Sequence, residues 1–227
     1  MQDKKKKVKN IFDAIAGKYD FLNHLLSFGV DHYWRRKALK LTKVGNDTIL
    51  LDVACGTGDF AIEASRQNVR KITGADFSQN MLRLFKKKQN WIDGKVVQTI
   101  AEQMPFRDES FTNITVAFGV RNFYDVKEGF KSFHRVLKDK GKATVLEFQM
   151  PENKFFRSLY KFYFKKILPL IGGIISKNKT AYQYLPESVE EFDEKISLVD
   201  LLKEAGFRSV KKYKLTFGIV QVVIAQK

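Results

Sequence analysis

The chain has 227 residues, with 41 lysines and arginines against 25 aspartates and glutamates and a formal net charge of +16. This length suits one domain with a single core. The single cysteine, Cys55, excludes a disulfide framework and a cysteine-based zinc site. We therefore expect the protein to reside in a reducing cytoplasm and to bind no metal ion. No apolar run approaches about 18 residues, which argues against a membrane-spanning helix, while the positive charge favours an anionic partner, either nucleic acid or a membrane surface.

The first predicted element is a basic, amphipathic helical segment at the N-terminus. After MQDKKKKVKN, apolar residues recur at spacings of three and four, which indicates one face of a helix. These residues are Val8, Ile11, Phe12, Ile15, Tyr19 and Leu22. We expect residues 1–45 to form a helical lid on the rest of the domain.

From residue 48 onward, short apolar runs alternate with amphipathic segments. The predicted strands are residues 48–54, 71–76, 95–100, 113–118 and 142–148. The predicted helices between them are residues 57–67, 79–90 and 126–138. Such alternation indicates a parallel sheet with helices on both faces and a ligand site at the carboxyl ends of its strands. Residues 46–150 are therefore expected to form a cofactor-binding core.

A glycine turn follows the first predicted strand, in the segment ILLDVACGTGDF (residues 49–60). The apolar run stops at Asp52, and Gly56, Thr57 and Gly58 precede an amphipathic helix. Glycines let a ligand approach the backbone, and Thr57 offers a hydroxyl group and amides at the start of a helix. The alternative is an ordinary strand-to-helix turn in which Thr57 caps the helix.

The next predicted strand ends at Asp76, 18 residues after Gly58. An acidic residue at this position can accept hydrogen bonds from ribose hydroxyls, although it could instead cap the following helix. The dinucleotide fingerprint needs a third glycine where Ala61 stands. A cationic nucleoside without phosphate, S-adenosylmethionine, therefore fits the turn better than a dinucleotide does.

The alternation lapses over residues 151–188, where aromatic and basic side chains interleave, especially in 155–175. Such a mixture suits a membrane interface, where rings lie at the headgroup level and lysines meet anionic lipids. A buried helix with a solvated basic face is the alternative. Residues 189–227 are expected to form a helix near 190–205 and two β-rich runs, 208–217 and 219–226, which should pair antiparallel because so few residues separate them.

Four segments carry a resemblance to the ubiquinone/menaquinone biosynthesis C-methyltransferases of the UbiE/MenG type. They are YDFLNHLLSFGVDHYW (19–34), AEQMPFRDESF (101–111), AFGVRNFYD (117–125) and RVLKDKGKATVLEF (135–148). The resemblance covers nearly the whole chain. It implies the Rossmann-like class I S-adenosylmethionine-dependent methyltransferase fold, an α/β fold with a seven-stranded, mostly parallel sheet, helices on both faces and a C-terminal antiparallel hairpin.

The resemblance also implies an activity, which is C-methylation of demethylmenaquinol by S-adenosylmethionine, with 2-methoxy-6-polyprenyl benzoquinol as a second or alternative acceptor. Ile100 and Ala101 would contact the adenine; the alternative for both is an ordinary place in the hydrophobic core. Ala117 would complete the cofactor site together with Asp52, Gly56, Thr57, Gly58 and Asp76. Tyr19, Asp20 and Asn23 would close over the substrate. A polyprenyl quinol as substrate implies peripheral contact with the inner face of the cytoplasmic membrane, and we expect a homodimer.

Arg121 and Asn122 follow the fourth predicted strand, where a transferable methyl group would lie. A quinol carbon becomes nucleophilic when the neighbouring hydroxyl loses its proton, and a phenol pKa near 10 makes this unfavourable unless positive charge stabilises the phenolate. We therefore predict a catalytic role for Arg121 and Asn122; the alternative is an arginine paired with Asp125 or Glu147 as a structural clamp. His24 and His32 are candidate proton acceptors, although lone histidines more often pack.

Two rival functions remain open at this stage. An RNA methyltransferase would use the same fold and the positive charge, but the sequence contains no N-P-P-Y or D-P-P-Y tetrapeptide, no paired cysteines and no added RNA-binding module. A non-catalytic protein that binds lipid or cofactor would not need the GVRN segment beside the glycine turn. The sequence therefore favours a quinol methyltransferase that does not bind nucleic acid.

Overall fold

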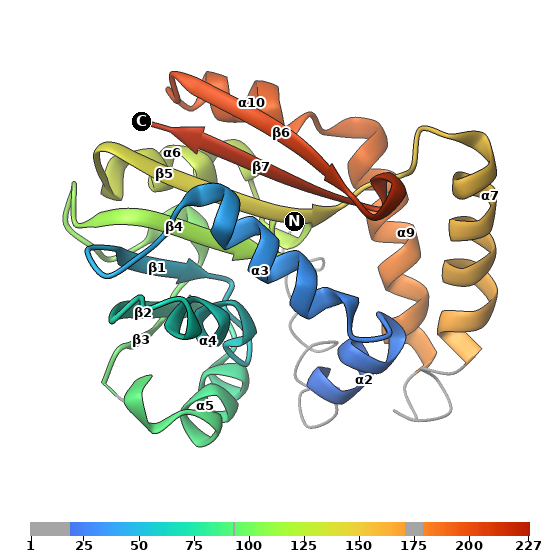
Figure 1. The fold of residues 1–227 in the computed structure, drawn as a ribbon, viewed down its shortest axis with the longest axis horizontal. Coiled ribbons are helices and arrows are strands. Elements are labelled where there is room, and N and C mark those ends of the chain that lie inside the picture. Colours follow the sequence, from blue (N-terminus) through green and yellow to red (C-terminus); the bar gives the residue numbers. More distant parts are fainter. Residues whose placement is uncertain (1–18, 93, 171–178) are drawn as a thin grey trace.

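The computed structural model describes residues 19–92, 94–170 and 179–227. Its centre is a seven-stranded sheet with the strand order β3-β2-β1-β4-β5-β7-β6 (Figure 1). The strands are β1 (Ile49–Val53), β2 (Lys71–Asp76), β3 (Val96–Gln98), β4 (Phe111–Ala117), β5 (Leu137–Phe148), β6 (Ser209–Leu215) and β7 (Val220–Gln226). The first five run parallel, and β7 pairs antiparallel with both β5 and β6. The predicted fold class, hairpin included, is confirmed.

The strand order reverses between β1 and β4, because the chain first builds β2 and β3 on one side of β1 and then β4 and β5 on the other. Leu50 and Leu51 of β1 belong to the two different core clusters, since successive side chains of a strand point to opposite faces. In open α/β sheets the crevice at such a reversal is where ligands bind. The glycine turn of residues 56–58 follows β1 at this crevice.

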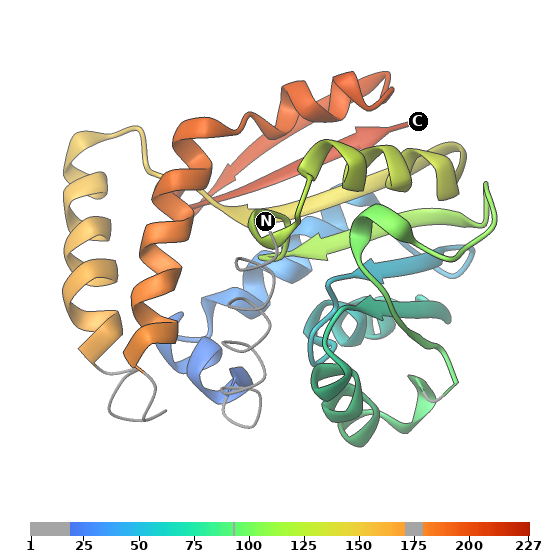
Figure 2. The ribbon, with the colours of Figure 1, turned by 180° about the vertical axis from the view of Figure 1, so that it is seen from behind.

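Helices cover both faces of the sheet (Figures 1 and 2). On the face seen in Figure 1 lie α3 (Val30–Thr42), α4 (Asp59–Arg66) and α5 (Gln79–Lys88), whose buried residues share one core cluster. On the opposite face, seen in Figure 2, lie α6 (Val126–Val136) and α10 (Leu198–Glu204), with the other cluster. Short 3₁₀ turns complete the connections: η2 (Asn90–Ile92), η3 (Ala101–Gln103), η4 (Val120–Asn122) and η6 (Thr216–Gly218).

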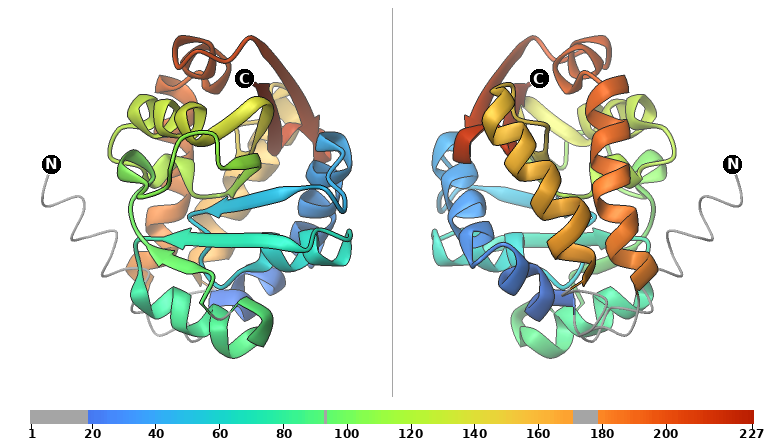
Figure 3. Two further views of the ribbon diagram at one scale, coloured as in Figure 1. Left: turned by 90° about the vertical axis from the view of Figure 1, so that its left-hand side faces the viewer. Right: turned by 90° about the vertical axis from the view of Figure 1, so that its right-hand side faces the viewer.

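Three helices lie beyond the carboxyl ends of the strands. They are α2 (Tyr19–Leu26), α7 (Lys154–Phe162), which continues as a π-helical turn η5 (Tyr163–Ile167), and α9 (Lys179–Lys195). α7 and α9 lie side by side in the right-hand view of Figure 3, and Glu190 of α9 pairs with Lys161 at 2.7 Å and with Lys165 at 2.6 Å. None of the helices in the described part of the chain is long and apolar enough to cross a membrane.

The predicted boundaries need two corrections. The helix expected near 190–205 is two helices: α9 ends at Lys195, and Ser197 caps α10 by accepting a hydrogen bond from the Asp200 amide at 3.3 Å. The strand expected at 142–148 begins at Leu137, which pairs with Phe111. Val8, Ile11, Phe12 and Ile15 of the predicted N-terminal helix lie outside the described residues.

Candidate active site

A cleft opens at the carboxyl ends of β1, β2 and β4, and we call it the strand-end cleft. Six residues that the sequence pointed to line it together: Gly56, Asp76, Ile100, Ala101, Ala117 and Asn122. They come from five different segments of the chain. Five of the eight predicted cofactor residues and one predicted catalytic residue are thus brought to one place.

The glycine turn and Asp76 are joined by backbone hydrogen bonds. The Asp76 carboxylate accepts from the Gly56 amide through Oδ2 at 2.8 Å and from the Ser78 amide through Oδ1 at 2.8 Å. Gly56 and Gly58 have φ values of +54° and +90°, a conformation that favours glycine. A Cβ atom on Gly56 would meet nothing within 4 Å, whereas one on Gly58 would lie 2.2 Å from the ring of Phe85. Gly56 therefore leaves space open beside the turn, whereas Gly58 lets the turn pack closely against Phe85.

Asp52, Thr57 and Gly58 are not among the residues that line the cleft. The buried Asp52 carboxylate accepts hydrogen bonds from Thr115 Oγ1 at 2.8 Å and from the Ala61 amide at 3.2 Å. Burial raises the pKa of Asp52 to about 7, although these two hydrogen bonds act in the opposite direction. Asp52 thus ties β1 to β4 and to the first turn of α4.

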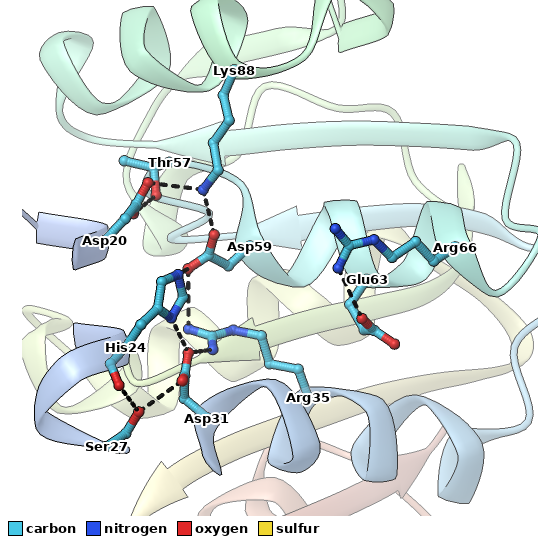
Figure 4. A network of polar contacts seen from close by, with 10 residues as sticks. All are labelled: Asp20, His24, Ser27, Asp31, Arg35, Thr57, Asp59, Glu63, Arg66 and Lys88. Atoms are coloured by element: carbon cyan, nitrogen blue, oxygen red, sulfur yellow. Dashed lines mark hydrogen bonds and ion pairs between the residues drawn. The ribbon is translucent and has the colours of Figure 1, made fainter. Parts of the chain in front are cut away.

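An ionic network joins α2 to the glycine turn (Figure 4). Asp20 of α2 accepts hydrogen bonds from the Thr57 hydroxyl and from Lys88 Nζ, the latter at 2.8 Å. Lys88 also donates to Asp59, in the first turn of α4, at 2.5 Å. Burial opposes the charge on Asp59, yet Arg35 and Lys88 keep its pKa below the ordinary value. α2 is therefore held against both α4 and α5 at the edge of the cleft.

Of the two candidate histidines, His24 belongs to this network and His32 stacks on it, and neither lines the cleft. His24 Nδ1 lies 2.8 Å from Asp31 Oδ2, and the rings of His24 and His32 stack with their centroids 4.3 Å apart. Asp31 is also paired with Arg35 Nη1 at 2.5 Å (Figure 4). Because Arg35 already neutralises Asp31, the cluster of His24, Asp31 and His32 is poorly suited to binding a metal ion. Of the predicted substrate residues, Asp20 is in the network, while the side chains of Tyr19 and Asn23 lie outside the described ones.

Arg121 forms the ion pair that the clamp alternative required. Its Nη1 donates to Glu147 Oε1 at 2.7 Å and to the Phe118 carbonyl oxygen at 2.6 Å. Glu147 has no exposed surface, so the pair is buried at the end of β5. Asp125 is occupied elsewhere, since it caps α6 by accepting from the Glu128 amide at 3.0 Å. The clamp with Glu147 therefore exists beside any catalytic role of Arg121.

A second hollow, the aromatic cavity, lies between α7, α9, η6 and the connection from α2 to α3. It encloses about 580 Å³. Its lining includes Trp34, Phe118, Arg121, Phe148, Tyr160 and Tyr184. Phe118 lines the cleft as well, so cleft and cavity meet at the segment that carries Arg121 and Asn122. Two ligands could thus meet at the end of β4.

Two tyrosines of this site were missed at the level of sequence. The Tyr184 hydroxyl of α9 donates to Asn122 Oδ1 at 3.0 Å and orients that amide. Tyr160 of α7 is buried in the wall of the cavity. The sequence leaves two interpretations of the aromatic stretch open, a membrane interface and a buried helix with a solvated basic face. Its helical spacing separates two buried residues, Tyr160 and Phe164, from two exposed ones, Phe155 and Phe162. That spacing was the signal that could have found Tyr160.

The ubiE/COQ5 methyltransferase family matches the chain over residues 1–227. The chain is 43% identical to the ubiquinone/menaquinone biosynthesis C-methyltransferase UbiE of Geotalea uraniireducens, over 100% of this chain and 99% of that protein. It is 43% identical to the demethylmenaquinone methyltransferase of Chlorobaculum parvum, over 97% of this chain and 92% of that protein. Among solved structures, an S-adenosylmethionine-dependent methyltransferase of Thermotoga maritima is similar with a TM-score of 0.66 and 18% identity, over 96% of this chain and 99% of that chain. At that identity the likeness concerns the fold.

Proposed function

This chain belongs to the ubiE/COQ5 methyltransferase family, and from that premise we propose that it methylates a ring carbon of demethylmenaquinol, with S-adenosylmethionine as the methyl donor. A 2-methoxy-6-polyprenyl benzoquinol is a second acceptor with the same chemistry. The observation that carries the proposal is the meeting of the strand-end cleft with a large aromatic cavity at Phe118. A reaction between a polar nucleoside and an apolar ring needs two such adjoining sites.

The lining of the strand-end cleft fits S-adenosylmethionine. Gly56 leaves open the space that a Cβ would fill, so a ligand can approach the backbone of the turn. Asp76 lies at the end of β2, and a carboxylate can accept several hydrogen bonds at once, including those of a ribose. Ile100, Ala101 and Ala117 offer small or apolar surfaces for an adenine ring. Asp52, Thr57 and Gly58 support this site indirectly, through the shape of the turn.

The chain's own residues would prepare the acceptor. When bound, S-adenosylmethionine supplies a methyl group made electrophilic by its sulfonium centre. The acceptor carbon is nucleophilic only when the adjacent hydroxyl is deprotonated, and a phenol resists this at neutral pH. Because the Arg121–Glu147 pair is neutral as a whole, Arg121 stabilises the phenolate by directed hydrogen bonds more than by net charge. The ring carbon gains a methyl group and releases its hydrogen as a proton.

The decisive assay measures methyl transfer to each candidate acceptor. Purified protein is incubated with methyl-labelled S-adenosylmethionine and, separately, with a short-chain demethylmenaquinol, a demethylated benzoquinol or total RNA. The expected result is label in the extracted quinol, with a higher kcat/KM for one of the two ring systems. Label in the RNA and none in either quinol would overturn the proposal.

α2 would act as a lid over the acceptor site, since its Leu26 lines the aromatic cavity and Asp20 connects the helix to Thr57 and Lys88. Removing residues 1–28 deletes α2 and ends before α3, whose Trp34 belongs to the core. We expect turnover to fall by about 100-fold or more, because a lid orders the acceptor and excludes water. Calorimetry with S-adenosylhomocysteine should show a much smaller loss of donor-site affinity. Equal losses in both measurements would contradict the lid.

The outer face of α7 would rest on an anionic membrane surface. Phe155, Leu159 and Phe162 are 71%, 56% and 58% exposed and recur at helical spacing, so they form one apolar stripe. Phe28 and Phe217 are 82% and 69% exposed, and each ring contacts an aromatic ring of the α7–η5 segment. A polyprenyl tail has to pass from the bilayer to the cavity, and Leu159 and Phe162 of this stripe also line the cavity.

Replacing the three stripe residues with serine should reduce binding to anionic vesicles at least about 10-fold, since each substitution removes apolar surface from the interface. Vesicle flotation measures the bound fraction, and vesicles of neutral lipid serve as the comparison for the electrostatic part. The thermal midpoint should change little, because the side chains are exposed in the folded protein. Unchanged flotation of the triple variant would refute this membrane face.

A further inference from the structure

Buried polar atoms without a partner gather around the aromatic cavity. Among the described residues, four buried side-chain atoms have no hydrogen-bond partner: Arg35 Nε, Arg121 Nε, Ser132 Oγ and Tyr160 Oη. Three of these four belong to residues that line the cavity, and only Ser132 lies elsewhere. An unpaired buried polar atom costs about 1–3 kcal/mol and is rare in folded proteins. Three at one cavity indicate a ligand that brings polar atoms of its own.

Tyr160 is set firmly in the wall of this cavity. It is 5% exposed, and its ring stacks on Phe164 with the centroids 4.0 Å apart. Phe164 in turn packs edge-on against Phe148, and the Arg121 guanidinium lies over the Phe148 ring, 5.8 Å from its centroid. A continuous aromatic wall therefore runs from Tyr160 to Arg121. The hydroxyl of Tyr160 is held in place by this wall and not by a hydrogen bond.

The other tyrosines of the lining differ from Tyr160 in this respect. Within the described part of the chain, Tyr163 and Tyr184 also line the cavity. The Tyr163 hydroxyl donates to the Leu26 carbonyl oxygen at 2.6 Å, and the Tyr184 hydroxyl donates to Asn122. Burial raises the pKa of Tyr160 well above its ordinary value, with Arg121 acting against this and Glu147 adding to it. Tyr160 is thus a protonated donor at neutral pH.

We propose that Tyr160 is an acceptor-binding residue, whose hydroxyl donates a hydrogen bond to an oxygen on the acceptor ring. This inference rests on the function proposed above and names a contact that fixes the acceptor. With one ring oxygen held by Tyr160 and Arg121 on the same aromatic wall, the ring is oriented toward the cleft, while the apolar remainder of the cavity takes the tail. Rings without oxygen would leave the hydroxyl unpaired and would bind less well.

The test compares two probes that differ only in oxygen. A short-chain 2-prenyl-1,4-naphthoquinone and the matching 2-prenylnaphthalene are titrated into wild-type protein and into Tyr160→Phe, which keeps the ring and its stacking. We expect the preference for the oxygenated probe to fall about 10-fold in the variant, the value of one hydrogen bond. The KM of the quinol should rise by a similar factor. Donor-site affinity, measured with S-adenosylhomocysteine, should be unchanged, and the thermal midpoint should stay the same or rise because an unpaired hydroxyl is removed.

Tyr163→Phe is the matched control, since it removes a hydroxyl from the same helical segment that already has a protein partner. It should lower the thermal midpoint and leave the probe preference as in wild type. If Tyr160→Phe keeps the full preference while wild-type protein methylates quinol, the inference is overturned and the proposed function stands. If wild-type protein methylates no quinol but shows a Tyr160-dependent preference, the contact stands and the proposed function fails.

Discussion

Replacing Arg121 with methionine should lower the free energy of unfolding by about 3–5 kcal/mol, the usual consequence of breaking one side of a buried ion pair. Glu147 has no exposed surface and depends on Arg121 Nη1 at 2.7 Å for its charge compensation. The remaining partners of its carboxylate are backbone amides, those of Phe148 and Arg121. Because methionine fills a similar volume, the loss of stability would come from the unpaired charge of Glu147 and not from a cavity.

The double variant Arg121→Met with Glu147→Gln separates the clamp from the catalytic role. Glutamine removes the stranded charge and can still accept from the Phe148 amide, so stability should return to within about 1 kcal/mol of wild type. Turnover of a quinol should remain lower by about 100- to 1000-fold, because a donor aimed at the developing phenolate is missing. Urea unfolding and a single-turnover assay measure the two quantities. Recovery of turnover with stability would mean that Arg121 is only a clamp.

Much of the fold follows from local pattern. Each parallel strand up to β4 is a short apolar run between turn residues, and the predicted ranges overlap the observed ones because the hydrophobic period changes visibly between strand and helix. The break at Ser197 was missed, since an isolated serine interrupts an amphipathic pattern only when its side chain caps the next helix. Boundaries thus depend on single hydrogen bonds that the pattern does not reveal.

The sequence predicted the position of the site better than it predicted the role of each residue there. Gly56, Asp76 and Ala117 could be placed together because strand ends of a parallel sheet meet at one edge. The supporting role of Asp52 could not, because it depends on Thr115, 63 residues further along the chain. The same holds for Asp20, whose partner Lys88 is 68 residues away. Long-range partners decide whether a polar residue faces a ligand or its own protein.

Alanine at Gly58 should destabilise the protein by about 3 kcal/mol, whereas alanine at Gly56 should cost only about 1 kcal/mol. Both positions carry the strain of a positive φ, worth about 1 kcal/mol for a residue with a side chain. Only at Gly58 does the new Cβ overlap a neighbour, because it would lie 2.2 Å from ring atoms of Phe85, which has no exposed surface and cannot easily move. Urea unfolding of the two variants should give this order.

Donor binding should show the opposite order. The Cβ at position 56 would point into open space at the strand-end cleft, where the proposed ligand approaches the turn, so Gly56→Ala should weaken S-adenosylhomocysteine at least about 10-fold in calorimetry. Gly58→Ala, measured at a temperature where it is folded, should bind within a few-fold of wild type, because Gly58 does not line the cleft and its substitution disturbs the packing of α4 on α5. Adding Phe85→Leu to Gly58→Ala should restore part of the lost stability and leave the affinity alone. Equal effects of the two glycine substitutions on affinity would mean that the cleft is not where the donor binds.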